Sequence, residues 1–297
     1  MDTARIPRPV VVGYDHSDCS LAALTWAGQL AESTGAPVKV VHASEAIVHA
    51  QDVAFGLLNP TSEHEFAQRV AREGADQLSA RYPSLEVEAS GSILSARVAL
   101  DEASTRASMI VIGSHGRGRF GSMMLGSTAY ALSGHARCPV IVVRDGEAPL
   151  PGPRRPVVVG SDGSVSASRA ADVAADLAGH WRAPLLVVSS WMPPPPDPWD
   201  HPPFGYPSVS ACLEAREAKA RKTNLDVLEH IRTRHHDVEA EGRVVEARPE
   251  DAIANASPDA AMLILGSRGH STLMGALLGS TARAVLHHST MPVMIVH

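Results

Sequence analysis

The chain has 297 residues, 44% of them hydrophobic and 20% charged, a composition that is ordinary for globular domains. Its 26 Lys and Arg against 32 Asp and Glu leave a net charge of −6, which gives no support for a nucleic-acid-binding face. No segment reaches the roughly 18 consecutive apolar residues of a membrane-spanning helix, and no apolar signal core is present. We therefore expect a cytoplasmic protein, long enough for two domains, without a membrane or nucleic-acid partner.

In chain order, short apolar runs alternate with longer amphipathic stretches in the first half. The runs predict strands that are buried on both faces: Val10–Val12, Val38–Val41, Met109–Ile112 and Val140–Val143. Ser17 predicts the N-cap of a helix after the first strand, and Gly35 predicts its end before Pro37. The second half repeats this pattern with Ser164 as the N-cap. Strands alternating with helices predict parallel βαβ units, hence an α/β fold with a doubly wound, Rossmann-like parallel sheet.

The chain contains this module twice. Two blocks of the first half recur in the second half at offsets of 147 and 153 residues: 9–44 recurs as 156–191, and 107–143 recurs as 260–297. Between the copies lies the segment 144–156, which is rich in Pro and Gly and typical of a linker. We predict two tandem domains, residues 1–147 and residues 154–297.

The stretch 191–208, WMPPPPDPWDHPPFGYPS, interrupts the second copy. Proline lacks a backbone N–H and fixes φ, which excludes a helix or an interior strand here. We predict a long loop after the second strand of this module. Two interpretations stay open, a disordered surface insertion and a flap over a binding site.

Cysteine and histidine usage argues against metal chemistry. Cys19, Cys138 and Cys212 are far apart and form no CxxC pair, which argues against a disulfide framework and a thiolate zinc site. Side chains of the adjacent pairs His235–His236 and His287–His288 would diverge on a helix or strand. We expect no metal site built from protein ligands alone.

The glycines around residue 116 first suggest a dinucleotide-binding turn, because Gly116-x-Gly118-x-x-Gly121 has the corresponding spacing. That turn should follow the first strand of its unit, whereas this one follows the fourth. The second module reads GHSTLM from Gly269 onward and breaks the spacing. We therefore reject this interpretation.

A different glycine pattern occurs in both modules: G-x-x-G, nine residues, then G-S-T. Glycine at the end of a buried strand lets an anion approach backbone amides without a Cβ in the way. The helix that starts at G-S-T offers free N–H groups, the positive end of its dipole and two hydroxyl donors. The pattern predicts a phosphate site in each module at the carboxyl ends of the strands. Its residues are Gly113, Gly116, Gly126, Ser127 and Thr128 in the first module and Gly266, Gly269, Gly279, Ser280 and Thr281 in the second.

Together with the leading VVVGYDHS and VVVGSDGS and the following CPVIVV and MPVMIV, this pattern closely resembles the universal stress protein family. The complete motif is that of its ATP-binding subclass, and the resemblance covers essentially the whole chain as a tandem two-domain member. It implies a stress-response regulator with one ATP site per domain, ATP being bound with Mg²⁺. It also implies that the final strands, Val140–Val143 and Val293–Val296, pair within the chain, with a homodimer as the expected assembly.

The resemblance further implies roles for individual residues. Asp15 and Asp162 would be the acidic residues near the nucleotide, and Ala43 and Ser190 would offer backbone contacts to adenine. Residues 93–102 of the first module lack the proline of their counterpart, residues 244–253, which weakens any contact expected from them. The expected nucleotide contacts also include Gly13, Arg117, Gly160 and Arg268 besides the glycine motifs with Ser127 and Ser280.

Binding is favoured over catalysis. The chain has no G-x-x-x-x-G-K-[ST] loop, and no Ser/His/Asp constellation repeats between the modules. We expect no catalytic residues. Two alternatives remain, an ATP pyrophosphatase-type enzyme, which GSDGSVSAS (160–168) faintly resembles, and an interaction module that binds no nucleotide.

Overall fold

The computed structural model describes residues 8–44, 60–116, 125–146, 148–193, 209–256, 258–270 and 278–297. The chain divides into two compact units. The first contains Met1–Leu150 together with Thr290–Ile295 and His297, and the second contains Pro151–Ser289 with Val296. Among the described residues, no helix is both long enough and apolar enough to cross a bilayer. Most of the Pro-rich stretch, residues 194–208, lies outside the described ranges, as do residues 117–124 with Arg117.

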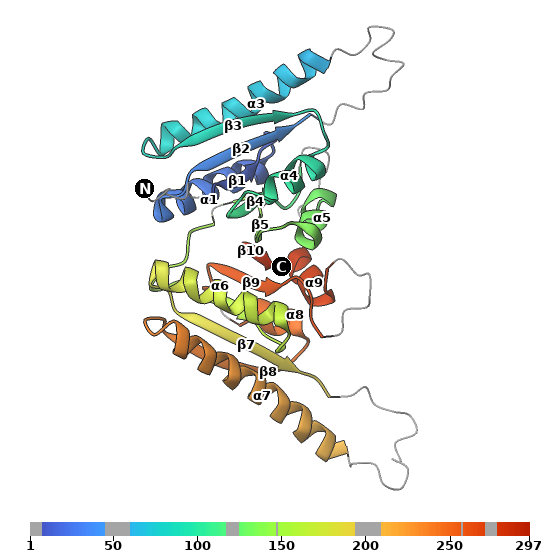
Figure 1. Ribbon diagram of the computed structural model, residues 1–297. Helices are drawn as coiled ribbons and strands as arrows, with labels where there is room; N and C mark the ends of the chain where they lie inside the picture. The colour runs from blue at the N-terminus through green and yellow to red at the C-terminus, as the bar shows by residue number, and fades with distance from the viewer. Residues whose placement is uncertain are drawn as a thin grey trace, which may run out of the picture. The chain divides into compact units, whose positions relative to one another are not determined.

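The first unit is a six-stranded sheet with helices packed on it (Figure 1). The strand order is β3-β2-β1-β4-β5-β10, and all neighbours run parallel except β5 and β10. Its elements are β1 (Val10–Gly13), α1 (Asp18–Thr34), β2 (Val38–Ala43), α3 (Pro60–Arg81), β3 (Val87–Ser92), α4 (Ala96–Ser104), β4 (Met109–Gly113), α5 (Ser127–His135), β5 (Val140–Val143) and β10 (Val293–Val296).

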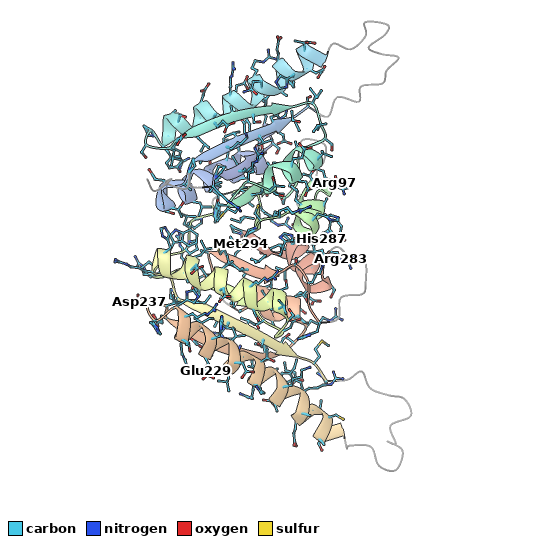
Figure 2. The ribbon with its side chains drawn as sticks, in the orientation of Figure 1. Arg97, Glu229, Asp237, Arg283, His287 and Met294 are labelled. Carbon is cyan, nitrogen blue, oxygen red and sulfur yellow. The ribbon has the colours of Figure 1, made fainter. Side chains whose placement is uncertain are left out.

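The last strand of the chain belongs to this first sheet. β10 pairs with β5 in antiparallel register, Val293 opposite Val142 and Ile295 opposite Val140. Met294, labelled in Figure 2, lies between them and is fully buried. This is the pairing of the two final strands that the family resemblance implied. It covers the edge of β5, a strand whose four residues are all buried.

The second unit holds the parallel strands β9-β6-β7-β8. Here α7 packs against β7 and β8, as α3 packs against β2 and β3 in the first unit (Figure 1). Its elements are β6 (Val157–Gly160), α6 (Val165–Trp181), β7 (Leu185–Trp191), α7 (Val209–Arg234), β8 (Ala240–Glu246), α8 (Pro249–Ala254), β9 (Met262–Gly266) and α9 (Ser280–His288).

Local chemistry explains where the helices begin and end. The Ser17 side chain accepts a hydrogen bond from the Ser20 N–H at the start of α1, and Ser164 accepts one from the Ala167 N–H at the start of α6. Gly35 ends α1 with a φ of 67°, a left-handed conformation that glycine adopts without steric cost. These three predictions are confirmed, and so is the α/β fold with parallel βαβ units.

Helices cover both faces of the first sheet, and two glycines show how closely. A Cβ on Gly13 would lie 3.2 Å from the side chain of Leu100 in α4. A Cβ on Gly113 would lie 2.7 Å from the backbone carbon of Cys19 in α1, on the opposite face. The sheet is therefore doubly wound, and its carboxyl edge lies between the two helical layers.

Candidate functional site

A cavity of about 420 Å³ opens at the carboxyl ends of β1, β2 and β4, beside the start of α5. Its volume falls in the range of roughly 300–1,000 Å³ that is typical of small-molecule sites. Every described residue that the sequence proposed for the first module lies in its wall: Gly13, Asp15, Ala43, Gly113, Gly116, Gly126, Ser127 and Thr128.

Backbone hydrogen bonds hold the end of β4 against the start of α5. The Ser114 N–H donates to the Val143 carbonyl at 2.8 Å, and the Gly126 N–H donates to the Ser114 carbonyl at 2.7 Å. The second unit repeats both bonds, from Ser267 to Val296 at 2.7 Å and from Gly279 to Ser267 at 2.8 Å. The G-S-T segment of each module is thus positioned by main-chain groups.

The starts of α5 and α9 lack the side-chain caps of α1 and α6. Their N-cap residues are Gly126 and Gly279, which have no side chain that could accept from the first-turn N–H groups. Ser127 and Thr128, the first residues of α5, line the cavity. Because uncapped N–H groups and the helix dipole favour an anion, the start of α5 forms a donor-rich end of the cavity.

Asp15 forms an acidic part of the wall. Its Oδ1 accepts from the Ser17 N–H at 3.0 Å and from the Ser17 Oγ–H at 2.5 Å, which fixes the carboxylate. A Cβ on Gly116 would lie only 2.5 Å from Asp15 Oδ2. The second glycine of the motif therefore leaves room for the carboxylate.

The second unit has the same aspartate arrangement. Asp162 Oδ1 accepts from the Ser164 N–H at 2.9 Å, and its Oδ2 accepts from the His270 N–H at 3.1 Å. A Cβ on Gly269 would again lie 2.5 Å from the carboxylate.

The first glycine of the motif has a packing role that differs from the sequence interpretation. The pattern suggested that Gly113 and Gly266 clear the way for an anion. The structure instead puts α1 and α6 where the Cβ atoms would be, 2.7 Å from the backbone carbons of Cys19 and Ser166. These glycines allow a helix to sit directly on the strand end, which brings Asp15 and Asp162 to the same edge as the G-S-T segment.

Among the residues of the cavity wall that sequence reasoning missed are Tyr14 and His42. His42 Nδ1 donates to the Tyr14 carbonyl at 2.7 Å, and the Tyr14 hydroxyl accepts from Gln77 Nε2 at 3.0 Å. Burial raises the pKa of Tyr14, and the charges of Glu73 and Asp15 add to this, whereas the Gln77 hydrogen bond opposes it. A polar residue directly after the apolar pair Val40–Val41, as His42 is, could have indicated this contact.

The residue after the aspartate adopts a left-handed conformation in both units. His16 has a φ of 67° and Gly163 has a φ of 82°. A side chain is strained in this region, and His16 is held there beside Tyr14 and by an ion pair from its Nε2 to Glu73 of α3 at 2.9 Å.

The remaining residues proposed for the second module lie at the matching strand ends. Gly160 and Ser190 fall at the ends of β6 and β7, and Arg268 is exposed after β9. In the first unit, Ala96 and Leu100 of α4 line the cavity although that segment lacks the proline of the second module. No group of three or more His, Cys, Asp or Glu side chains among the described residues could hold a metal ion.

Comparison with known proteins decides the family. The model of the universal stress protein family matches residues 7–144 and, a second time, residues 153–297. The chain belongs to the universal stress protein family. A universal stress protein of Mycobacterium tuberculosis is 31% identical to it over 309 residues, covering 99% of both chains. One of Mycolicibacterium smegmatis is 30% identical over 291 residues, covering 97% of this chain and 96% of the other.

A solved universal stress protein from Archaeoglobus fulgidus shares the fold of this universal stress protein across both repeats. The TM-score is 0.68 at 20% identity, with 97% of this chain and 98% of that chain covered.

Proposed function

We propose that this universal stress protein binds ATP with Mg²⁺, one molecule in each unit, and acts as a nucleotide-dependent regulator of a stress response. The observation that carries the proposal is the cavity of the first unit, whose wall joins the uncapped start of α5 to the fixed carboxylate of Asp15. The second unit supports it, because Asp162 and the start of α9 repeat the hydrogen bonds of their counterparts.

The chemistry of the wall assigns an end of the nucleotide to each part. The amides and hydroxyls of Ser127 and Thr128 suit phosphate oxygens. Asp15 accepts hydrogen bonds and repels phosphate, so it suits the ribose hydroxyls. The apolar stretch between Ala43 and Leu100 suits the adenine ring, with backbone groups of Ala43 at its polar edge.

Binding without catalysis is part of the proposal. Mg²⁺ would neutralise part of the phosphate charge, and the start of α5 would hold the phosphates. The chain carries no Walker-type lysine loop that would pull on the terminal phosphate. Bound nucleotide would then act by stabilising one conformation of the protein, as any ligand of the folded state does. The cytoplasmic location stays a prediction.

The test is the release of nucleotide from the protein purified without added ligand. Acid denaturation and chromatography of the supernatant should yield adenine nucleotide, up to one per unit. Gly116→Glu puts a second carboxylate against Asp15 and should empty the first unit, and Gly269→Glu should empty the second. Gly152→Ala, where a Cβ meets nothing within 4 Å, is the matched control.

Two results would contradict the proposal. Absence of nucleotide, together with no heat of binding when Mg-ATP is added, would exclude the ATP site. Conversion of added ATP to ADP that the two glycine variants abolish would show catalysis at the same site.

A further inference from the structure

The two sheets differ at their outer edges. β3 and β8 are outermost strands, each with a strand neighbour on one side only. Directly before β8, the Glu239 carbonyl accepts from the Leu185 N–H of β7, so odd-numbered residues of β8 direct their backbone groups toward β7. The groups of Ala240, Gly242 and Val244 therefore face outward. By the same alternation, Ala89 and Gly91 face outward in β3, because the Glu86 carbonyl bonds to Val38 of β2.

A side chain of α3 caps the edge of β3. The Gly91 N–H donates to Gln68 Oε1 at 2.7 Å, and Gln68 Nε2 donates to the Ala89 carbonyl at 3.0 Å. The amide of Gln68 thus makes the two hydrogen bonds that a neighbouring strand would make. Capping of this kind protects an edge against pairing with another chain.

The edge of β8 has no such cap within the described residues. The polar side chain that α7 directs at this part of the sheet is Asn224. Its Nδ2 donates to the Val187 carbonyl at 2.9 Å and to Ser189 Oγ at 3.2 Å in β7, and to the Arg243 carbonyl of β8 at 3.4 Å, which faces β7 and not outward. The outward groups of β8 are left for an added strand.

The charges along β8 fit a second copy of the same strand. In an antiparallel pair centred on Gly242, Glu241 of one chain stands opposite Arg243 of the other, and the reverse pair forms across the axis. Opposite charges at directly opposed positions stabilise a strand pair, and like charges destabilise it. Ala240 and Val244 pair in the same register.

α7 presents a matching stripe on the side that such a dimer would cover. His230 of α7 bonds to Asp172 of α6 at 2.7 Å and marks the side toward α6. At about 100° per residue, Leu225 lies on the other side of the helix, beyond Asn224. Its side chain is large, apolar and 62% exposed.

The two residues four positions from Leu225 complete the stripe. Arg221 precedes it and is paired with Glu217 of the same helix at 2.6 Å, with its side chain 64% exposed. Glu229 follows it and points outward from α7 in Figure 2. When two copies of α7 run antiparallel with Leu225 against Leu225, Arg221 of one meets Glu229 of the other. The antiparallel pairing of the two β8 strands and the antiparallel packing of the two α7 helices therefore both place opposite charges against each other around one two-fold axis.

We propose that the β8 edge and the Arg221–Leu225–Glu229 stripe of α7 form a homodimer interface. The occupant is a second copy of this chain, whose β8 extends the sheet while its α7 packs beside the first. The proposal is independent of nucleotide binding.

The test is the dimer dissociation constant, measured by sedimentation equilibrium on the full chain. Leu225→Glu, at an exposed position, and Val244→Pro, which removes an outward N–H, should each raise it about tenfold or more. Arg221→Glu and Glu229→Arg should each weaken the dimer, and the double variant should restore it. Lys219→Glu, at an exposed position of the same helix on the side of His230, is the matched control.

Circular dichroism of each variant checks that it is folded, and the double variant keeps the test valid if one single variant is not. A wild-type chain that stays monomeric at every concentration overturns the proposal. So does a dimer that Leu225→Glu and Val244→Pro leave unchanged, because another surface then holds it together.

Discussion

The two halves of this universal stress protein keep the same main-chain contacts around different side chains. In each half, the N–H of the serine after β4 or β9 (Ser114 or Ser267) donates to the last strand of that half. The N–H of the G-S-T glycine (Gly126 or Gly279) donates to the carbonyl of that serine. The side chains that follow the first two strands differ, however, because Ser161 and Ser189 of the second unit replace Tyr14 and His42. The main-chain acceptor is still kept: Ser189 donates to the Ser161 carbonyl, as His42 donates to the Tyr14 carbonyl. A site built from backbone groups can be kept while its rim diverges. The two units therefore share the main-chain arrangement at the G-S-T segment and differ in the side chains after the first two strands.

The largest expected effect tests the shared part. Gly113→Val and Gly266→Val would drive a side chain into helix backbone, which cannot move aside as a side chain could. We expect each to lower the free energy of unfolding of its own unit by about 3 kcal/mol. Hydrogen exchange read by mass spectrometry resolves the two units. Equal losses of stability in the two units would confirm that both glycines make room for a helix. A unit whose stability does not change would refute this role for its own glycine.

Alkaline pH should separate the halves. Burial raises the pKa of Cys138 in the first unit from 9.0 to about 12, and burial also raises that of Tyr14. The folded state then keeps protons that the unfolded chain releases, so the stability of the first unit falls as pH rises from about 9 to about 12.

Urea unfolding at several pH values in this window measures that slope. Cys138→Ala should flatten it, and Tyr14→Phe should flatten the part above pH about 10. A slope that both variants leave unchanged would assign the alkaline loss to other groups.

A smaller effect tests the left-handed position after each aspartate. Gly163→Ala should cost about 1–2 kcal/mol, because the backbone there has a φ of 82° and the new Cβ would lie 3.1 Å from Thr223. Gly152→Ala, which has neither feature, should cost less than half as much. Thermal unfolding of the two variants measures both losses of stability. Equal losses would mean that the left-handed backbone at Gly163 is not the cause.

The smallest effect concerns the ion pair that is present in one half. Glu73→Gln removes the partner of His16, but both side chains are more than one third exposed, at 38% and 48%. We expect the free energy of unfolding to change by less than about 1 kcal/mol. A larger loss in chemical denaturation would mean that this pair, beyond the packing around Tyr14, holds His16 in its strained conformation.

Strands buried on both faces were the part of the fold that the sequence predicted best. The runs starting at Val10, Val38, Met109 and Val140 are all strands that begin at the predicted residue. Continuous apolar runs are unambiguous in a parallel sheet. The edge strands β3 and β8 escaped prediction because they are half-exposed and partly polar, as VEASGS and AEGRVVE show.

The candidate site was predictable where chemistry is local and not where it depends on packing. The uncapped helix start at Gly126 was predictable from the adjacent residues, because the G-S-T segment itself shows that a glycine precedes the helix. The role of Gly113 depends on Cys19, which is distant in the chain, and a side chain 94 residues away cannot be read from a local motif. The strain at His16 was equally hidden, because histidine is more frequent than most residues in the left-handed region but adopts it too rarely for a single position to be predicted.

The pairing of β10 with β5 also sets an order of events during synthesis. The ribosome finishes the first repeat long before residues 293–296 are made, so the edge of β5 stays uncovered until those residues have been made. A chain cut at the linker would carry that bare edge permanently, and a chain that lost its last few residues would leave the damage in the half made first. Protection of the β5 edge in the N-terminal half is thereby tied to residues that are translated about 150 residues later.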